Sequence, residues 1–118
     1  MHIRPYQKLV VWQEAHTLCL LIYRLTKNFP TCERFRLVDQ MCRSSSSIST
    51  NIAEGSVMNT KKHRFHFYSI ASASLEELHY QCLLSKDIQY ISDSEFIALD
   101  KQIQRTSFLL MKIKESLH

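Results

Sequence analysis

The residues best suited to chemistry are cations gathered at one point of the chain. Lys61, Lys62 and Arg64 lie within four consecutive positions, beside His63 and His66. Fixed positive charges at a helix start oppose the helix dipole by about 0.3–1 kcal/mol each, so stability alone would favour acids there. A bound phosphate relieves this conflict, because the free N–H groups of a helix start already attract anions. An ordinary solvated basic turn is the alternative.

Further arginines extend this basic character. Arg34 and Arg36 repeat the arrangement at the start of the second predicted helix, and Arg43 lies within that helix. Residues 1–75 carry ten Lys and Arg against four Asp and Glu, a net charge of +6, whereas residues 76–118 carry five against seven, a net charge of −2. The positive charge therefore belongs to the first three predicted helices and favours phosphate contacts. The predicted nucleic-acid-binding residues are Arg34, Arg36, Arg43, Lys61, Lys62 and Arg64.

A metal-dependent enzyme is the competing chemistry. Glu76 and His79 form a Glu-x-x-His pair of the kind found in di-iron bundles, and Glu115 with His118 repeats it. A helical hairpin that turns near residue 91 leaves these pairs far apart, and the additional inward glutamates are missing. The cysteines lack zinc-type spacing and are expected to be buried thiols: Cys19, Cys32, Cys42 and Cys82. We predict no enzyme activity, no metal and no cofactor.

The scarcity of helix breakers predicts how these residues are positioned. The chain has 118 residues, one glycine and two prolines, and 45% of its residues are hydrophobic. Breaks are expected at Phe29-Pro30, near Gly55 and around residues 90–93, which leaves four helices. One glycine also excludes Walker-type loops, dinucleotide fingerprints and nucleophile elbows. The sequence predicts a single all-α domain over residues 1–118, an antiparallel up-down four-helix bundle.

Apolar steps of three and four residues indicate where each helix lies. The first is expected over residues 8–27, and the second from an N-cap at Thr31 to a left-handed Gly55. Residues 44–47 are all serine, but the apolar pattern continues in phase across them, which predicts one helix with close backbone packing. The third helix begins after residue 59 or 60, and the fourth with the capping box Ser92-Asp93-Ser94-Glu95. The third is expected to bury Phe67, Ile70, Ala71, Ser74, Leu78 and Cys82.

A polar stripe is predicted beside the apolar face of the second helix. Its members recur at three- or four-residue steps, which places neighbouring side chains within hydrogen-bonding reach. Arg43 and Glu54 are predicted to join a buried network that fixes helix register or a subunit contact. The stripe consists of Gln40, Arg43, Ser47, Asn51, Glu54 and Gly55.

Some apolar side chains remain after each helix has been given one core-facing stripe. A second apolar helix face usually packs against another surface, which predicts self-association. Scattered surface hydrophobes are the alternative. The predicted oligomer interface consists of Phe65, Tyr80, Leu83, Leu84, Phe108 and Leu109.

Several sequence blocks together resemble one known family. They are residues 12–15 (Trp-Gln-Glu-Ala), residues 29–33 (Phe-Pro-Thr-Cys-Glu), residues 51–55 (Asn-Ile-Ala-Glu-Gly) and residues 70–78, with Phe35, Leu37, Gln40, Arg43 and Ser47-Ile48 between them. In this combination the chain resembles the four-helix bundle proteins encoded in bacterial 23S ribosomal RNA intervening sequences. It departs from the family pattern at Arg36 and Ala73, where glycine is frequent, and at Ser49, where proline is frequent.

The resemblance implies a homo-oligomeric ring of five bundles. It also implies a distant likeness to accessory proteins of diversity-generating retroelements, which bind nucleic acid and a reverse transcriptase. With the basic clusters, we predict a non-enzymatic homo-oligomer that binds structured RNA or DNA. A protein-interaction scaffold or accessory subunit without a nucleic-acid role is the alternative. No apolar run reaches 18 residues and the first residues do not resemble a signal peptide, so a cytoplasmic protein without a membrane span is expected.

Overall fold

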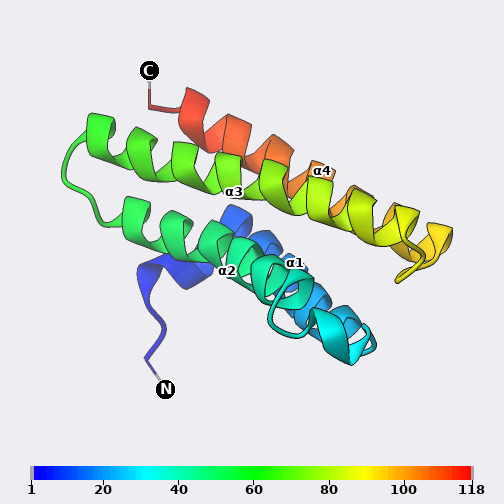
Figure 1. Cartoon of the computed structure of the whole chain (residues 1–118). Helices are drawn as coiled ribbons and strands as arrows, with labels where there is room; N and C mark the ends of the chain where they lie inside the picture. The colour runs from blue at the N-terminus through cyan, green and yellow to red at the C-terminus, as the bar shows by residue number, and fades with distance from the viewer. Residues whose placement is uncertain (1, 118) are drawn as a thin grey trace.

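Four α-helices and two short 3₁₀ helices form the fold in the computed structural model, which describes residues 2–117 (Figure 1). The prediction of an all-α protein with four helices is confirmed, and the described residues contain no strand. None of the described helices combines the length and apolar character needed to span a bilayer. In chain order the elements are η1 (Pro5–Lys8), α1 (Val10–Thr26), η2 (Thr31–Glu33), α2 (Leu37–Ser56), α3 (Lys61–Asp87) and α4 (Asp93–Glu115).

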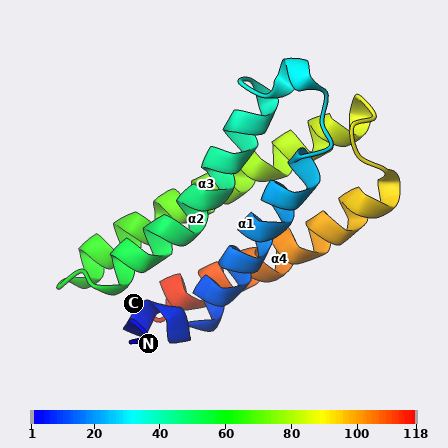
Figure 2. The same ribbon diagram turned by 90° about the horizontal axis from the view of Figure 1, so that it is seen from below.

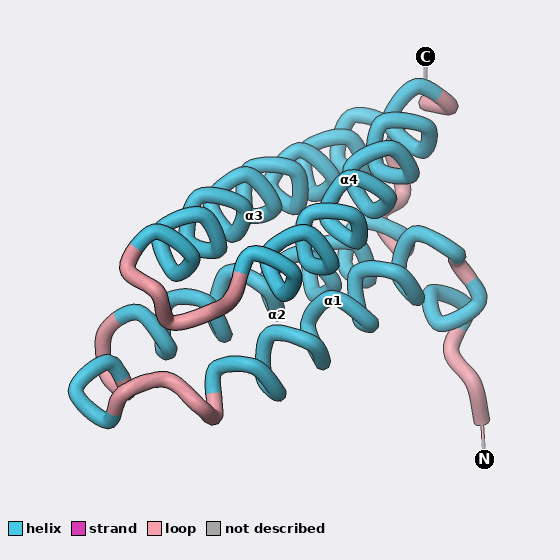
Figure 3. The backbone as a smooth tube through the Cα atoms, turned by 90° about the vertical axis from the view of Figure 1, so that its right-hand side faces the viewer, coloured by secondary structure: helices cyan, strands magenta, loops and turns pink. Residues whose placement is uncertain are grey.

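The helices pack in a closed cycle around one hydrophobic core (Figure 2). α2 and α3 make the most extensive contact, while α1 packs on α2, α4 packs on α3, and α1 also contacts α4. The connecting loops lie at the ends of the helices (Figure 3). Each large apolar side chain removed from water stabilises the fold by about 1.5–3 kcal/mol. The most deeply buried of these side chains are Leu18, Ile22, Met41, Ile48, Ile52, Leu78, Leu99 and Leu110.

The serine run lies inside α2, as predicted. Ser44 and Ser45 are buried, and the Ser44 hydroxyl donates to Gln81 Oε1 on α3 at 2.6 Å. The Ser45 hydroxyl donates to Cys19 Sγ on α1 at 3.6 Å. Every buried side-chain nitrogen and oxygen of the described residues has a hydrogen-bond partner. The small serines therefore allow close helix contacts without leaving a polar group unsatisfied.

The predicted start of the second helix is wrong. Thr31 begins η2, and α2 begins only at Leu37. Glu33 does not serve a helix start of α2, because its Oε2 accepts a hydrogen bond of 2.9 Å from the Tyr90 hydroxyl in the α3–α4 connection. This hydrogen bond raises the pKa of Tyr90. The Tyr90 ring also contacts the Phe29 ring, with centroids 5.2 Å apart, so the two connections at this end are fastened together.

Gly55 is the second correction. It lies within α2 and not in a left-handed cap, and no glycine of the described residues has a positive φ. A Cβ at this position would lie 2.8 Å from Tyr68 Cε1 and 3.1 Å from Phe67 Cβ on α3. Gly55 is therefore required by the approach of a neighbouring helix and not by backbone conformation.

The left-handed position falls on Gln89, with a φ of 67°. It ends α3 in a Schellman motif, because the Tyr90 N–H donates to the Ser85 carbonyl at 2.8 Å and the Gln89 N–H to the Lys86 carbonyl at 2.9 Å. Glycine usually occupies this position, so the chain ends its longest helix without one. The predicted capping box of α4 is confirmed, since Ser92 and Glu95 exchange hydrogen bonds of 2.9 and 3.1 Å.

The buried face of α3 is rotated from the predicted one. Ala71 and Leu78 are buried as predicted, but Ile70 is 36% exposed. Tyr68 and Leu75, which the pattern did not select, are buried instead. The missing side chain of residue 55 explains the rotation, because it leaves the space on α2 that the Tyr68 ring occupies.

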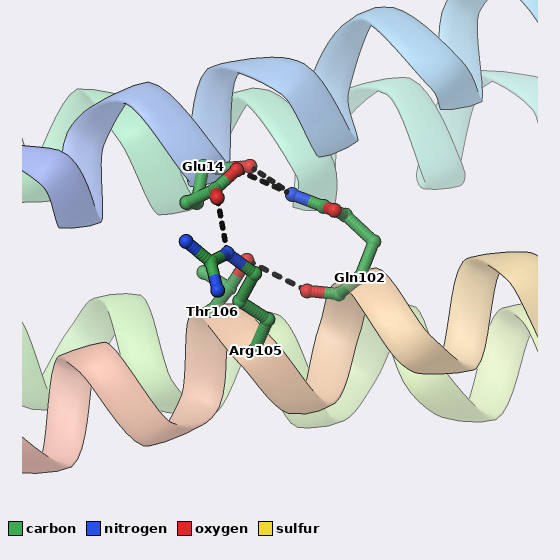
Figure 4. Close-up of polar contacts among 4 residues, drawn as sticks. All are labelled: Glu14, Gln102, Arg105 and Thr106. Atoms are coloured by element: carbon green, nitrogen blue, oxygen red, sulfur yellow. Dashed lines mark hydrogen bonds and ion pairs between the residues drawn. The ribbon is translucent and has the colours of Figure 1, made fainter.

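A polar cluster ties α1 to α4 (Figure 4). The Glu14 carboxylate accepts hydrogen bonds from Arg105 Nε and, at 3.1 Å, from Gln102 Nε2. Gln102 Nε2 also donates to the Glu14 backbone carbonyl at 2.9 Å, and the Thr106 hydroxyl donates to the Gln102 carbonyl at 2.9 Å. The hydrogen bond from Arg105, helped by that from Gln102, lowers the pKa of Glu14.

We expect Gly55→Ala to lower the free energy of unfolding by about 1–3 kcal/mol, because the new methyl group overlaps the Tyr68 ring. At an open helix position the same change would raise it by about 0.5–1 kcal/mol, so the sign identifies the cause. Urea unfolding followed by circular dichroism measures the change. Thr50→Ala, on an exposed position of α2, is the matched control. An alanine variant more stable than the wild type would contradict the proposed close approach.

The pKa of Glu14 predicts how stability depends on pH. A carboxylate with a lowered folded pKa stabilises the fold above its unfolded pKa, near 4.5, and this contribution is lost as pH falls through the folded value. We expect Glu14→Gln to be less stable than wild type at neutral pH and to lose less stability on acidification. Urea unfolding across that pH range provides the test. Glu115→Gln, which removes an exposed carboxylate 3.9 Å from Lys112, should keep the wild-type dependence. Parallel curves for Glu14→Gln and wild type would refute the assignment.

Candidate nucleic-acid interface

The first basic cluster lies at the start of α3. Lys61 and Lys62 are exposed in its first turn, directly after the N-cap residue Thr60. The Thr60 hydroxyl accepts a 3.1 Å hydrogen bond from the His63 N–H, which fixes the helix start. Arg64 is half-buried, and its Nε donates to the Met58 carbonyl at 2.7 Å. Arg64 therefore braces the α2–α3 turn, while the two lysines project into solvent.

The second basic cluster precedes α2. Arg34 and Arg36 are exposed on either side of Phe35, whose side chain is 84% exposed. The Arg34 guanidinium lies 5.5 Å from the centre of the Phe35 ring. α2 has 20 residues, so it separates this cluster from the first by about 30 Å. Apart from Arg43, the predicted cations thus form two groups at opposite ends of α2.

The exposed cations of the two clusters have no acidic partner among the described residues. Within residues 2–117, no carboxylate lies within 4.0 Å of Lys61, Lys62, Arg34 or Arg36. On α4, by contrast, Arg105 pairs with a glutamate, as does Lys112. Arg43 lies between the clusters with its side chain 81% exposed, 4.0 Å from Asp39, and such exposed pairs contribute little. The unpaired cations leave both ends of α2 electrostatically attractive to anions.

The first part of the polar stripe, Gln40, Arg43 and Ser47, borders a groove of about 460 Å³ between α2 and α3. The hydroxyls of Ser47 and Ser74 are 3.0 Å apart across it, and Asn51 Nδ2 donates to the Ser47 hydroxyl at 3.0 Å. Arg43 and Glu54 are both exposed on the single chain, so they do not form a buried network that fixes helix register within it, and their role in a subunit contact stays a prediction. Long charged side chains reach solvent here, whereas short hydroxyls bridge the two helices. Gln40 is exposed at the groove edge.

The buried link between α2 and α3 was missed at the sequence level. It is the hydrogen bond between Ser44 and Gln81, both of which are buried. Gln81 follows the buried Leu78 by three positions, so helical spacing places it on the core face. The available signal for this link was a glutamine at a core-facing position of α3, which needs a polar partner, together with the serine run of α2, which offers hydroxyls.

The predicted second apolar face is exposed only in part. The side chains of Tyr80 and Phe108 are 61% and 54% exposed. Leu84 and Leu109 do not belong to a free face as predicted, because both pack partly against the core of the bundle. Each of α3 and α4 contacts two neighbouring helices, so the buried part of its surface is wider than a single stripe. This wider burial explains why Leu84 and Leu109 are partly covered. Phe65 is 38% exposed, and Lys114 Nζ lies 5.1 Å from its ring centre. Leu83 is half-buried. Ile97 and Met111 are further exposed apolar residues.

The residues considered for a di-iron site have other arrangements. His79 Nε2 lies 3.4 Å from Asp100 Oδ1 on α4. Within the described part of the chain, no group of three or more His, Cys, Asp or Glu side chains is placed to hold a metal ion. Glu115 ends α4, and His118 lies outside the described residues.

Comparisons with known proteins agree with this architecture. A family model described as 23S rRNA-intervening sequence protein matches residues 7–112. A crystal structure of a protein of unknown function from the S23 ribosomal protein family of Bacteroides thetaiotaomicron superposes with a TM-score of 0.83. The two chains are 22% identical, and the match covers 90% of this chain and 96% of the other, which establishes a shared fold. No curated protein matches the chain.

Proposed function

Because the chain belongs to the 23S rRNA-intervening sequence protein family, we propose that it is a non-enzymatic helical bundle that binds structured RNA or DNA. The observation that carries this proposal is the pair of cation clusters at the two ends of α2, in which Lys61, Lys62, Arg34 and Arg36 lack acidic partners among the described residues. Contacts of this kind reach phosphates and do not read bases, so weak sequence specificity follows. Arg43 and Arg64 contribute charge, the latter while bracing its turn.

The proposed bundle is antiparallel and up-down. Between α3 and α4, Lys114 lies over the Phe65 ring and Lys86 over the Phe96 ring, so residue numbers rise on one helix as they fall on the other. The contacts between α2 and α3 follow the same inverse order, from Ser44 with Gln81 to Gly55 with Tyr68. Short connections of this kind favour neighbouring helices that run in opposite directions.

The proposed assembly is a homo-oligomeric ring of five copies. The family resemblance supports the ring, and the exposed Tyr80 and Phe108 rings supply an apolar surface for it. A ring repeats both cation clusters in every copy, so modest phosphate contacts at each cluster add up to tight binding of a long nucleic acid.

Salt dependence tests the phosphate contacts. We expect the double variant Lys61→Ala/Lys62→Ala to bind a structured RNA more weakly and to flatten the plot of log affinity against log salt by up to about two contacts per bound subunit. Fluorescence anisotropy at several salt concentrations gives the slope. Arg64 is left intact because it braces the turn.

The matched control removes two cations from the acidic half of the chain. Lys101→Ala/Lys112→Ala should leave the slope close to that of wild type. Equal slopes for wild type and Lys61→Ala/Lys62→Ala would remove the site assignment. A wild-type protein that binds no polyanion at low salt would favour the interaction scaffold instead.

Charge substitution tests the assembly. We expect Phe108→Glu and Tyr80→Glu to shift the protein toward smaller species, because each places a carboxylate in an apolar contact. Sedimentation velocity measures the species, and circular dichroism verifies that helicity is preserved. Thr50→Glu, on the exposed face of α2, should leave the assembly intact. If both substituted proteins sediment as the wild type does, this face is not the interface.

A further inference from the structure

A pocket of about 550 Å³ opens beside the second basic cluster. It lies between the end of α1, the connection that contains η2, and the first turns of α2. Its volume falls within the range of about 300–1,000 Å³ typical of small-molecule sites. Tyr23, Phe29 and Val38 supply apolar walls, and Lys27 and Arg34 line it as well.

The charges of this pocket all have one sign. Lys27 and Arg34 are the charged side chains among its described lining residues, and neither is within 4.0 Å of a carboxylate. Tyr23 is 48% exposed, so its ring is accessible from solvent. Aromatic walls with a cationic rim suit an occupant that is planar and apolar at one end and anionic at the other. A nucleobase with its phosphate has this chemistry.

An exposed aromatic ring lies next along the chain. Phe35 directly follows the pocket residue Arg34, and the Arg34 guanidinium lies near its ring. A phenylalanine that is 84% exposed contributes nothing to the core, whereas such rings serve as stacking platforms for unpaired bases. The hydrogen bond between Glu33 and Tyr90 holds this segment in place before any partner arrives.

We propose that the pocket takes one unpaired base of an RNA strand, with its phosphate on Arg34 and Lys27 and the neighbouring base stacked on Phe35. This inference rests on the proposed nucleic-acid function and gives it a preferred substrate, an RNA loop or single strand. The cluster at Lys61 and Lys62 contributes phosphate contacts to single-stranded and duplex RNA alike.

Two variants test the pocket without removing a cation. Phe35→Ala removes the stacking platform, and Thr31→Trp fills the pocket from an exposed lining position. We expect each to weaken binding of a short single-stranded RNA by about fivefold to a hundredfold, the effect of losing one stacked base. Affinity for an RNA duplex of equal charge should stay within about twofold of wild type in both variants. Fluorescence anisotropy at fixed salt measures both.

The controls separate the pocket from its surroundings. Phe35→Tyr should retain single-strand binding because it keeps the ring. Thr50→Trp should have no effect because it adds the same bulk on α2 at a position that does not line the pocket. Uridine monophosphate should compete with single-stranded RNA for binding to the wild-type protein but not for binding to the Thr31→Trp variant. Competition without any effect of Phe35→Ala or Thr31→Trp on RNA would reassign the pocket to a free nucleotide and overturn the inference.

The remaining outcomes distinguish this inference from the function beneath it. A wild-type protein that binds duplex and single-stranded RNA, with both affinities unchanged in both variants, refutes the pocket alone. A loss of single-strand affinity in Phe35→Ala without a loss in Thr31→Trp also refutes the pocket as the binding site. A wild-type protein that binds neither RNA refutes the nucleic-acid function itself.

Discussion

The close approach of α2 to α3 is the constraint on which the other features depend. Gly55 leaves room for the Tyr68 ring, and the hydrogen bond between the Ser47 and Ser74 hydroxyls, at an earlier point of α2, keeps the two backbones near each other. Because Tyr68 faces inward, the rest of α3 has a fixed rotation, and this rotation directs Tyr80 outward. It also fixes where the first turn of α3 leaves the bundle. The position of Lys61 and Lys62 is therefore a consequence of packing about two helical turns away, at Tyr68.

Two sets of charged side chains have different roles in this molecule. On α4, Arg105 pairs with Glu14 of α1 and so connects two helices of the bundle. At the two ends of α2 the cations have no such partners among the described residues and extend into solvent. The Arg105–Glu14 pair thus holds the bundle together, whereas the unpaired cations at the ends of α2 lie on the surfaces proposed to meet a polyanion.

The features predicted from sequence were those set by local contacts. The helix through the serine run and the capping box at Ser92 depend on neighbours a few residues away, so spacing alone identified them. The start of α2, the role of Gly55 and the buried face of α3 depend on contacts with Tyr90 and Tyr68, which are remote in sequence. For the candidate site, the two charge clusters could be predicted, because the cations of each cluster are neighbours in the sequence. The pocket beside Arg34 was not, because it is assembled from two helices and their connection.

The link between Glu33 and Tyr90 has a consequence for how a partner would be met. It joins two connections that are far apart in sequence, so the turn before α2 and the turn after α3 behave as one stiff unit. The loss of conformational freedom in that unit occurs when the chain folds and not when a ligand arrives. Association at this end then needs only an encounter in the correct orientation, without a slow rearrangement of the protein to follow.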